Sequence, residues 1–247
     1  MMAVLAGSAV AAGPLSGRAE SLASLQGSAG YSLADALIPY AQRDYVRAVK
    51  LLTPLAERGN AVAQLKLGII YSRGKLNSRD HVAALRWFTE AAENGQVEAQ
   101  FELGRIYRDG RGVNLDGKLA AYWFERAAQK DTVHAINALG ELYLGYQGIS
   151  QNFATARRWF LHGAQLGNAA SMYNIGVLYS RGQGVMQDDI EAFKWFALAA
   201  SMAVGQEREK ALHARALLAE RLTPMEVLWG EGRAEAWCLA HLAISGQ

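Results

Sequence analysis

Apolar residues recur at helical spacing along most of the chain, and residues 99–128 show the pattern most clearly. The first half of this segment carries four small or apolar residues that share one helix face: Ala99, Leu103, Gly104 and Tyr107. The second half carries another single stripe, made of Ala120, Trp123, Phe124 and Ala127. Asp116 precedes this stripe, and its short carboxylate can cap the first turn of a helix. The pattern therefore predicts two helices joined by a loop.

This helix pair repeats along the chain with a period of 36 residues, as the positions of the tryptophans show: Trp87, Trp123, Trp159 and Trp195. Four other residue types keep the same register: Phe88, Phe124, Phe160 and Phe196; Gly68, Gly104, Gly140 and Gly176; Tyr71, Tyr107, Tyr143 and Tyr179; Ala84, Ala120, Ala156 and Ala192. A repeat of this length without strand-like alternation predicts an all-α solenoid of antiparallel helix pairs. Because glycine inside a helix costs about 1 kcal/mol relative to alanine, its recurrence indicates close helix packing.

Glycine-rich loops join the two helices in the second and fourth units, at Gly110-Arg111-Gly112-Val113 and Gly182-Gln183-Gly184-Val185. Such loops can cradle phosphate, but these follow a helix rather than a strand and lack the Lys-Ser/Thr ending of a phosphate-binding loop. We predict instead that the glycines supply a positive φ where a helix ends.

The full pattern, A-x-x-x-L-G-x-x-Y-x-x-G-x-G-V-x-x-D-x-x-x-A-x-x-W-F-x-x-A-A, resembles the Sel-one-like repeat, a relative of the tetratricopeptide repeat with a longer internal loop. The first unit departs from it in the loop, with Gly74-Lys75-Leu76-Asn77, and the third with Tyr146-Gln147-Gly148-Ile149. The resemblance implies a right-handed superhelix of antiparallel helix pairs that binds other proteins.

The repeat pattern also divides the chain into segments. We predict four repeats over residues 61–204, an N-terminal capping helix pair over 31–60 and C-terminal capping helices over 205–247. Within the last segment, Thr223-Pro224 is typical of a helix start, and Gly230 and Gly232 are expected to interrupt the helix that follows.

Residues 1–30 are expected to be a leader and a flexible linker. Met1 to Ala12 are all apolar or small, and the small-x-small triplets that end this stretch are typical of signal-peptidase sites. A basic segment is missing, since the first positive residue is Arg18. We predict export to the bacterial periplasm or beyond; the alternative is a small-residue leader on a cytoplasmic protein.

Composition narrows the range of partners. The chain has 247 residues, 51% of them hydrophobic, and a formal net charge of +2, which gives no reason to expect nucleic acid. Cys238 is the only cysteine, so no intrachain disulfide can form. Some secreted Sel-one-like proteins have a cysteine pair in every repeat and are associated with penicillin recognition, but this chain has no such pairs.

Catalytic and metal-binding patterns are weak. The five histidines do not occupy equivalent repeat positions and show no His-x-x-x-His or His-x-His spacing. Cys238 and His241 lie three residues apart on an expected helix, but a nucleophilic cysteine also needs a third, orienting group. We predict no catalytic residue, no metal site and no cofactor.

Binding residues are predicted on the first helix of each unit, because these helices line the inner wall of a stacked solenoid. Residues about one turn from the shared core positions differ from unit to unit, as expected for a specialised groove on a common scaffold. They are Leu65 and Ile69; Phe101, Arg105 and Arg108; Asn137 and Glu141; and Tyr173 and Val177. Packing between repeats is the alternative for Phe101 and Tyr173. Pairing with Glu102 or Glu141 is the alternative for the arginines.

These observations favour a non-enzymatic adaptor or regulatory scaffold that binds a protein or peptide segment in its concave groove, as the resemblance also implies. Two alternatives are a hydrolase of the penicillin-recognising type and a cytosolic scaffold that self-associates through its terminal helices. The pattern leaves the partner and the oligomeric state open.

Overall fold

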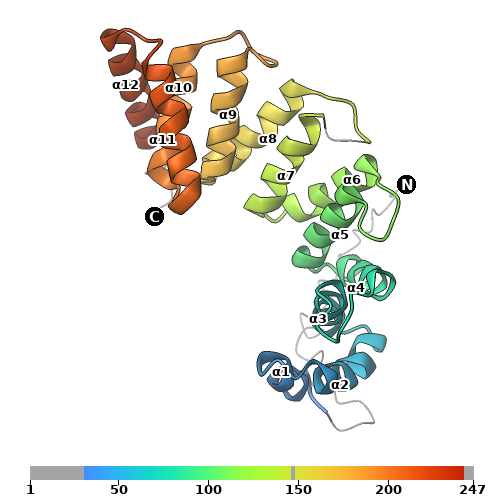
Figure 1. Ribbon diagram of the computed structural model, residues 1–247. Coiled ribbons are helices and arrows are strands. Elements are labelled where there is room, and N and C mark those ends of the chain that lie inside the picture. Colours follow the sequence, from blue (N-terminus) through green and yellow to red (C-terminus); the bar gives the residue numbers. More distant parts are fainter. Residues whose placement is uncertain (1–30, 146–147, 242–247) are drawn as a thin grey trace, which may run out of the picture.

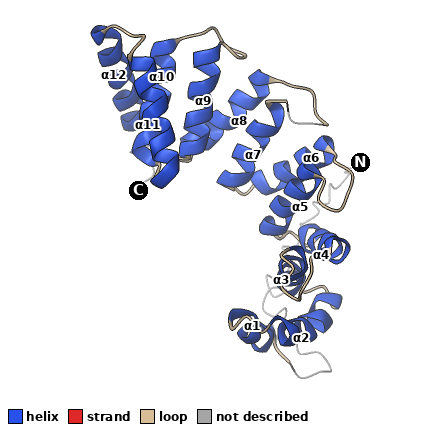
Figure 2. Cartoon of the chain, viewed as in Figure 1, coloured by secondary structure: helices blue, strands red, loops and turns tan. Residues whose placement is uncertain are grey.

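The chain, described from a computed structural model over residues 31–145 and 148–241, is entirely helical in those ranges (Figures 1 and 2). The helices of this part are α1 Leu33–Ala41, α2 Tyr45–Glu57, α3 Ala61–Ser72, α4 His81–Glu93, α5 Val97–Asp109, α6 Gly117–Ala128, α7 Val133–Tyr143, α8 Phe153–Gln165, α9 Ala169–Arg181, α10 Asp189–Met202, α11 Gly205–Ala219 and α12 Pro224–His241. The predicted all-α fold is confirmed. The prediction of a leader and linker concerns residues outside the described ranges.

Successive helices pack against each other in pairs, and the pairs follow an arc from α1–α2 at one end to α12 at the other (Figure 1). The first helices of neighbouring repeats also contact one another, α3 with α5, α5 with α7 and α7 with α9. Helix α11 continues this row by contacting α9. The row of first helices is the surface on which the binding residues were predicted.

Polar caps start the second helix of each repeat, as predicted for Asp116. The Asp116 carboxylate accepts a hydrogen bond from the Leu119 backbone N–H at 2.9 Å. The equivalent contacts are made by Asp80, Asn152 and Asp188. Gly110 and Gly182 end α5 and α9 with φ of 65° and 63°, which confirms their predicted conformation.

The recurring glycine of each first helix lies directly against the recurring phenylalanine of the second. A Cβ atom added to Gly104 would lie 2.4 Å from a ring carbon of Phe124, closer than non-bonded carbons approach. The same relation holds for Gly68 with Phe88, Gly140 with Phe160 and Gly176 with Phe196. The ring therefore occupies the space that a side chain would fill, which is the packing reason for these helical glycines.

The adjacent tryptophan and phenylalanine of each second helix pack in opposite directions along the solenoid. Trp123 joins the apolar cluster formed by α3, α4 and α5, whereas Phe124 joins the cluster shared with α7. The other pairs divide in the same way: Trp87 and Phe88, Trp159 and Phe160, and Trp195 and Phe196. Consecutive helix positions point about 100° apart, so one Trp-Phe pair can join a repeat to both of its neighbours.

The last helix differs from the prediction. Helix α12 runs without a break through Gly230 and Gly232, and Gly230 is buried against Phe193 of α10. Leu217 of α11 and Leu228 of α12 are 50% and 59% exposed. Thr223 caps α12 as predicted, since its hydroxyl accepts from the Glu226 N–H and Glu226 accepts from the Thr223 N–H.

Candidate functional site

The row of first helices encloses a continuous groove made of two adjoining cavities, which we call the concave groove. The larger cavity, about 320 Å³, is lined by Phe101, Arg105, Arg108, His134, Asn137, Glu141, Ala170 and Glu207, among others. The smaller, about 180 Å³, shares Glu141, Ala170 and Glu207 with it and adds Tyr173, Asn174 and Lys210. Residues of α5 and α11 line one cavity, so the row of first helices curves around it.

Five of the nine predicted binding residues therefore meet in one cavity: Phe101, Arg105, Arg108, Asn137 and Glu141. Tyr173 lines the adjoining cavity, where its ring centroid lies 5.2 Å from that of Phe196 and 4.4 Å from the Lys210 ammonium. Phe101 also packs against Phe124, with ring centroids 5.7 Å apart. The two aromatic residues combine packing between helices with a place in the groove.

Leu65 and Ile69 were predicted to line the groove, but they do not. They are 4% and 7% exposed and pack in the cluster that joins α3 to α4 and α5. They occupy the same repeat positions as Phe101 and Arg105, but both are aliphatic, and burial of such side chains is favourable. Val177 is half-buried beneath α11 in the cluster that contains Leu218, and it lines neither cavity.

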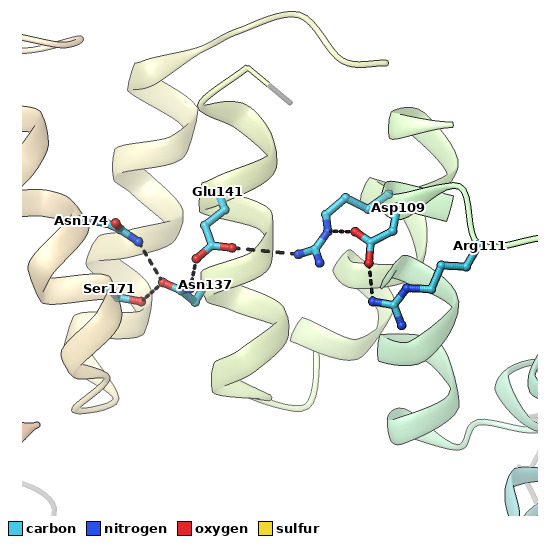
Figure 3. Close-up of polar contacts among 7 residues, drawn as sticks. Asp109, Arg111, Asn137, Glu141, Ser171 and Asn174 are labelled. Atoms are coloured by element: carbon cyan, nitrogen blue, oxygen red, sulfur yellow. Dashed lines mark hydrogen bonds and ion pairs between the residues drawn. The ribbon is translucent and has the colours of Figure 1, made fainter. Parts of the chain in front are cut away.

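A ladder of polar contacts crosses the groove from α9 to α5, as Figure 3 shows. The Asn137 amide oxygen accepts from the Ser171 hydroxyl at 3.1 Å and from the Asn174 amide at 3.4 Å. The Asn137 amide nitrogen donates to Glu141 at 2.8 Å. The other Glu141 oxygen lies 4.0 Å from the Arg108 guanidinium.

The ladder continues beyond the groove through Asp109. This carboxylate accepts from Arg108 at 2.7 Å and is also paired with Arg111 (Figure 3). Burial alone would raise the pKa of Asp109, but the hydrogen bonds and charges of the two arginines outweigh it and lower the pKa below its ordinary 3.8. A group with a lowered pKa loses its stabilising pairs only as the pH falls through that pKa, so Asp109 keeps its two arginine pairs at neutral pH.

Arg105 makes a separate ion pair on the same helix, with 3.0 Å between its guanidinium and the Glu102 carboxylate. Both predicted alternatives for the arginines thus hold, since Arg105 pairs with Glu102 and Arg108 lies near Glu141. The side chains of Arg105 and Arg108 keep 34% and 21% of their surface exposed. Partly exposed pairs of this kind are weak, so an incoming carboxylate can compete for the guanidinium groups.

The groove residues that the sequence prediction missed include His134, Ala170, Asn174, Glu207 and Lys210. Helical spacing could have found the first three, because they lie within a turn of predicted residues on α7 and α9. Glu207 and Lys210 come from α11, outside the repeats, and only the curvature of the solenoid brings them to the groove.

The groove presents charged, amide and aromatic groups and no arrangement of a nucleophile with a base. Within residues 31–145 and 148–241, no group of three or more His, Cys, Asp and Glu side chains could hold a metal ion. The His241 Nδ1 lies 3.1 Å from the Trp237 carbonyl oxygen, and the two rings stack with centroids 4.6 Å apart. This contact turns the histidine toward Trp237.

Similar solved structures include Sel1 repeat proteins. A Sel1 repeat protein from Oxalobacter formigenes matches with a TM-score of 0.63 and 24% identity, over 78% of this chain and 86% of that one. The c5321 protein, a protective antigen of uropathogenic Escherichia coli with an SLR fold, matches with a TM-score of 0.48 and 24% identity, over 85% of this chain and 53% of that one. At these identities the first likeness shows the fold, and the second carries no argument. No curated protein sequence matches the chain.

The Sel1 repeat family model matches five consecutive segments: residues 30–60, 61–96, 97–131, 133–168 and 169–204. The first segment contains α1 and α2, the pair that the sequence pattern assigned to an N-terminal cap. The family model therefore places five repeats where the pattern indicated four. The matched segments cover most of the chain. The chain belongs to the Sel1 repeat family, whose solenoids are in general scaffolds for protein–protein interaction.

Proposed function

We propose that this chain is a non-enzymatic scaffold that binds a protein or peptide segment in the concave groove. The observation that carries the proposal is the convergence of Phe101, Arg108, Asn137 and Glu141 from two helices on one cavity. Amide groups can pair with a peptide backbone, guanidinium groups with a carboxylate, and aromatic rings can anchor apolar side chains. A groove bounded by several parallel helices suits an extended or helical segment better than a small molecule.

No observation favours the penicillin-recognising alternative. A hydrolase of that type needs a serine or cysteine held beside a base in a pocket. Cys238 is half-buried on α12, and the described part of the chain shows no hydrogen bond between it and His241. The residues that line the concave groove include no serine, threonine or cysteine placed against a histidine.

Blocking the groove tests the proposal. Ala170 lines both cavities, so Ala170→Trp would fill the groove without removing an existing polar contact. Ala154→Trp is the matched control, because Ala154 is exposed on α8 in the outer helix layer. Partners captured from envelope and cytosolic extracts would be identified by mass spectrometry, and the purified partner would then be titrated against each variant.

We expect the partner to bind the natural chain and Ala154→Trp equally, and Ala170→Trp at least about tenfold more weakly, a loss of about 1.4 kcal/mol. Circular dichroism would show whether both variants keep the helical fold. Equal binding by a folded Ala170→Trp would place the interface elsewhere on the solenoid and overturn the proposal.

Export to the periplasm or beyond remains our proposal for the location, supported by the apolar residues and small-x-small triplets near Met1. Among the described residues, no helix is long and apolar enough to span a bilayer. If export with cleavage occurs, the chain recovered from a fractionated bacterium should lie in the envelope fraction. Its intact mass should show that the first residues have been removed. A full-length chain in the cytosolic fraction would contradict export.

A further inference from the structure

A separate cavity, of about 470 Å³, lies between the first two of the four central repeats, where α3 ends and α4 begins. Four arginines from separate segments line it: Arg73 after α3, Arg79 before α4, Arg105 on α5 and Arg111 in the loop after α5. We call it the arginine cavity. Its volume lies within the range of ordinary ligand pockets, about 300–1,000 Å³.

Positive charge is concentrated in this cavity far beyond the balance of the whole chain. Four arginines against one carboxylate, Glu102, leave a formal surplus of three positive charges along its lining, with His81 neutral. The entire chain has a formal net charge of only +2. Clustered like charges repel one another, and an anion bound among them would relieve that repulsion.

Two of the four arginines are in ion pairs within the described ranges, and the other two are not. Arg105 is paired with Glu102, and Arg111 with Asp109. Arg73 and Arg79 are exposed and make no ion pair with any residue in the described ranges. A guanidinium group presents a planar fork of N–H donors that matches a carboxylate or phosphate group.

The walls of the arginine cavity favour strong electrostatic binding. Ala84, Phe88 and Ile106 contribute apolar surface, and each is nearly fully buried. Low-dielectric walls strengthen the attraction between an anion and nearby cations. The loop that carries Arg111 is also held in place, because Gly112 lies against His81 so closely that an added Cβ would be 2.3 Å from the His81 Cβ.

We infer that the arginine cavity binds carboxylate or phosphate groups on the segment held by this scaffold, so that an acidic peptide is the preferred partner. The inference rests on the proposed function and makes it more specific. Arg105 lines both the concave groove and the arginine cavity, and Asp109 joins Arg108 of the groove to Arg111 of the cavity. One extended segment can therefore occupy both.

The test uses defined peptides and the purified chain, so it does not depend on the capture of a natural partner. Fluorescein-labelled hexaglutamate would be titrated by fluorescence anisotropy, with hexaglutamine as the neutral control. A peptide in which phosphoserine replaces two of the glutamines distinguishes phosphate from carboxylate as the preferred group. The test variant is Arg73→Gln with Arg79→Gln, which removes the two exposed, unpaired guanidinium groups and breaks no ion pair.

The matched control is Arg158→Gln with Arg181→Gln, which removes the same charge from exposed positions outside the arginine cavity. Arg181 occupies the same repeat position as Arg73, three periods of 36 residues later. We expect hexaglutamate to bind the natural chain and the control pair equally, and the test variant at least about tenfold more weakly. Binding should also weaken as the ionic strength rises from about 0.05 to about 0.3 M.

Equal weakening by the two pairs would mean that only overall charge matters and would overturn the inference. Failure of the natural chain to bind either acidic peptide more tightly than hexaglutamine would overturn it as well. Ala170→Trp separates this result from the wider proposal, because it blocks the groove and leaves the four arginines unchanged. If the acidic peptide still binds Ala170→Trp while the natural partner does not, the result supports both the groove as the partner's binding site and the arginine cavity as a separate anion-binding site.

Discussion

Replacing Phe124 with alanine is expected to lower the free energy of unfolding by about 3–5 kcal/mol. The Phe124 ring is fully buried and lies in the cluster shared by α6 and α7, together with Ile136 and Leu139. Its removal leaves a cavity beside Gly104, which has no side chain to fill it. Urea unfolding followed by far-ultraviolet circular dichroism would measure the change.

The loss should also weaken the coupling between the repeats that Phe124 joins, because a solenoid is stabilised by contacts between neighbouring units. We therefore expect a broader unfolding transition as well as an earlier one. Lys118→Ala on the same helix is the control, since Lys118 is exposed and its removal should change the free energy by no more than about 0.5 kcal/mol. A loss below about 1.5 kcal/mol for Phe124→Ala would contradict the assigned role of the ring.

Adding a methyl group at Gly104 is expected to destabilise the chain by up to about 2 kcal/mol, although alanine is the better helix former. The gain in helix propensity is about 1 kcal/mol. The opposing effect is the overpacking of a buried interface, which typically costs about 1–3 kcal/mol. It arises because the added Cβ would lie 2.4 and 2.5 Å from two Phe124 ring atoms. Thermal and urea unfolding of Gly104→Ala would measure the net effect.

Gly232 provides the matched control for this substitution. It lies inside α12, and an added Cβ would meet no atom within 4 Å. Gly232→Ala should therefore stabilise the chain by up to about 1 kcal/mol. A double-mutant cycle of Gly104→Ala with Phe124→Leu should show coupling of about 0.5–3 kcal/mol, because a smaller side chain makes room for the methyl group. Additive effects would show that the two residues do not share the space.

The concave groove and the arginine cavity differ in how they depend on the pattern of the repeat. Many residues of the concave groove occupy first-helix positions that every repeat has, with side chains that differ from unit to unit, as Phe101, Asn137 and Tyr173 illustrate. The arginine cavity instead draws three of its four arginines from segments outside the helices: Arg73, Arg79 and Arg111. A search limited to the regular helix positions would therefore find the groove and overlook the arginine cavity.

The predicted groove residues show where repeat register stops being informative. Leu65, Phe101 and Asn137 occupy equivalent positions, yet Leu65 is buried between helices and the other two line the groove. The register shows the direction in which a side chain points from its own helix. It does not show how closely the next helix approaches. Leu65 lies in one buried cluster with Leu103 and Ile106 of α5.

The amino-acid sequence by itself determined the repeated helix pairs, their caps, the family and the core positions that the repeats share, because helical spacing, capping residues and turn glycines are local signals. Asp116 and Gly110 could be assigned in this way, and so could the need for close packing at Gly104. Only the tertiary structure decided that Phe124 fills the space beside Gly104, that Glu207 and Lys210 reach the groove, and that four arginines meet in one cavity. These relations depend on the small rotation between successive repeats, which accumulates over the whole solenoid and is set by side-chain packing at every interface.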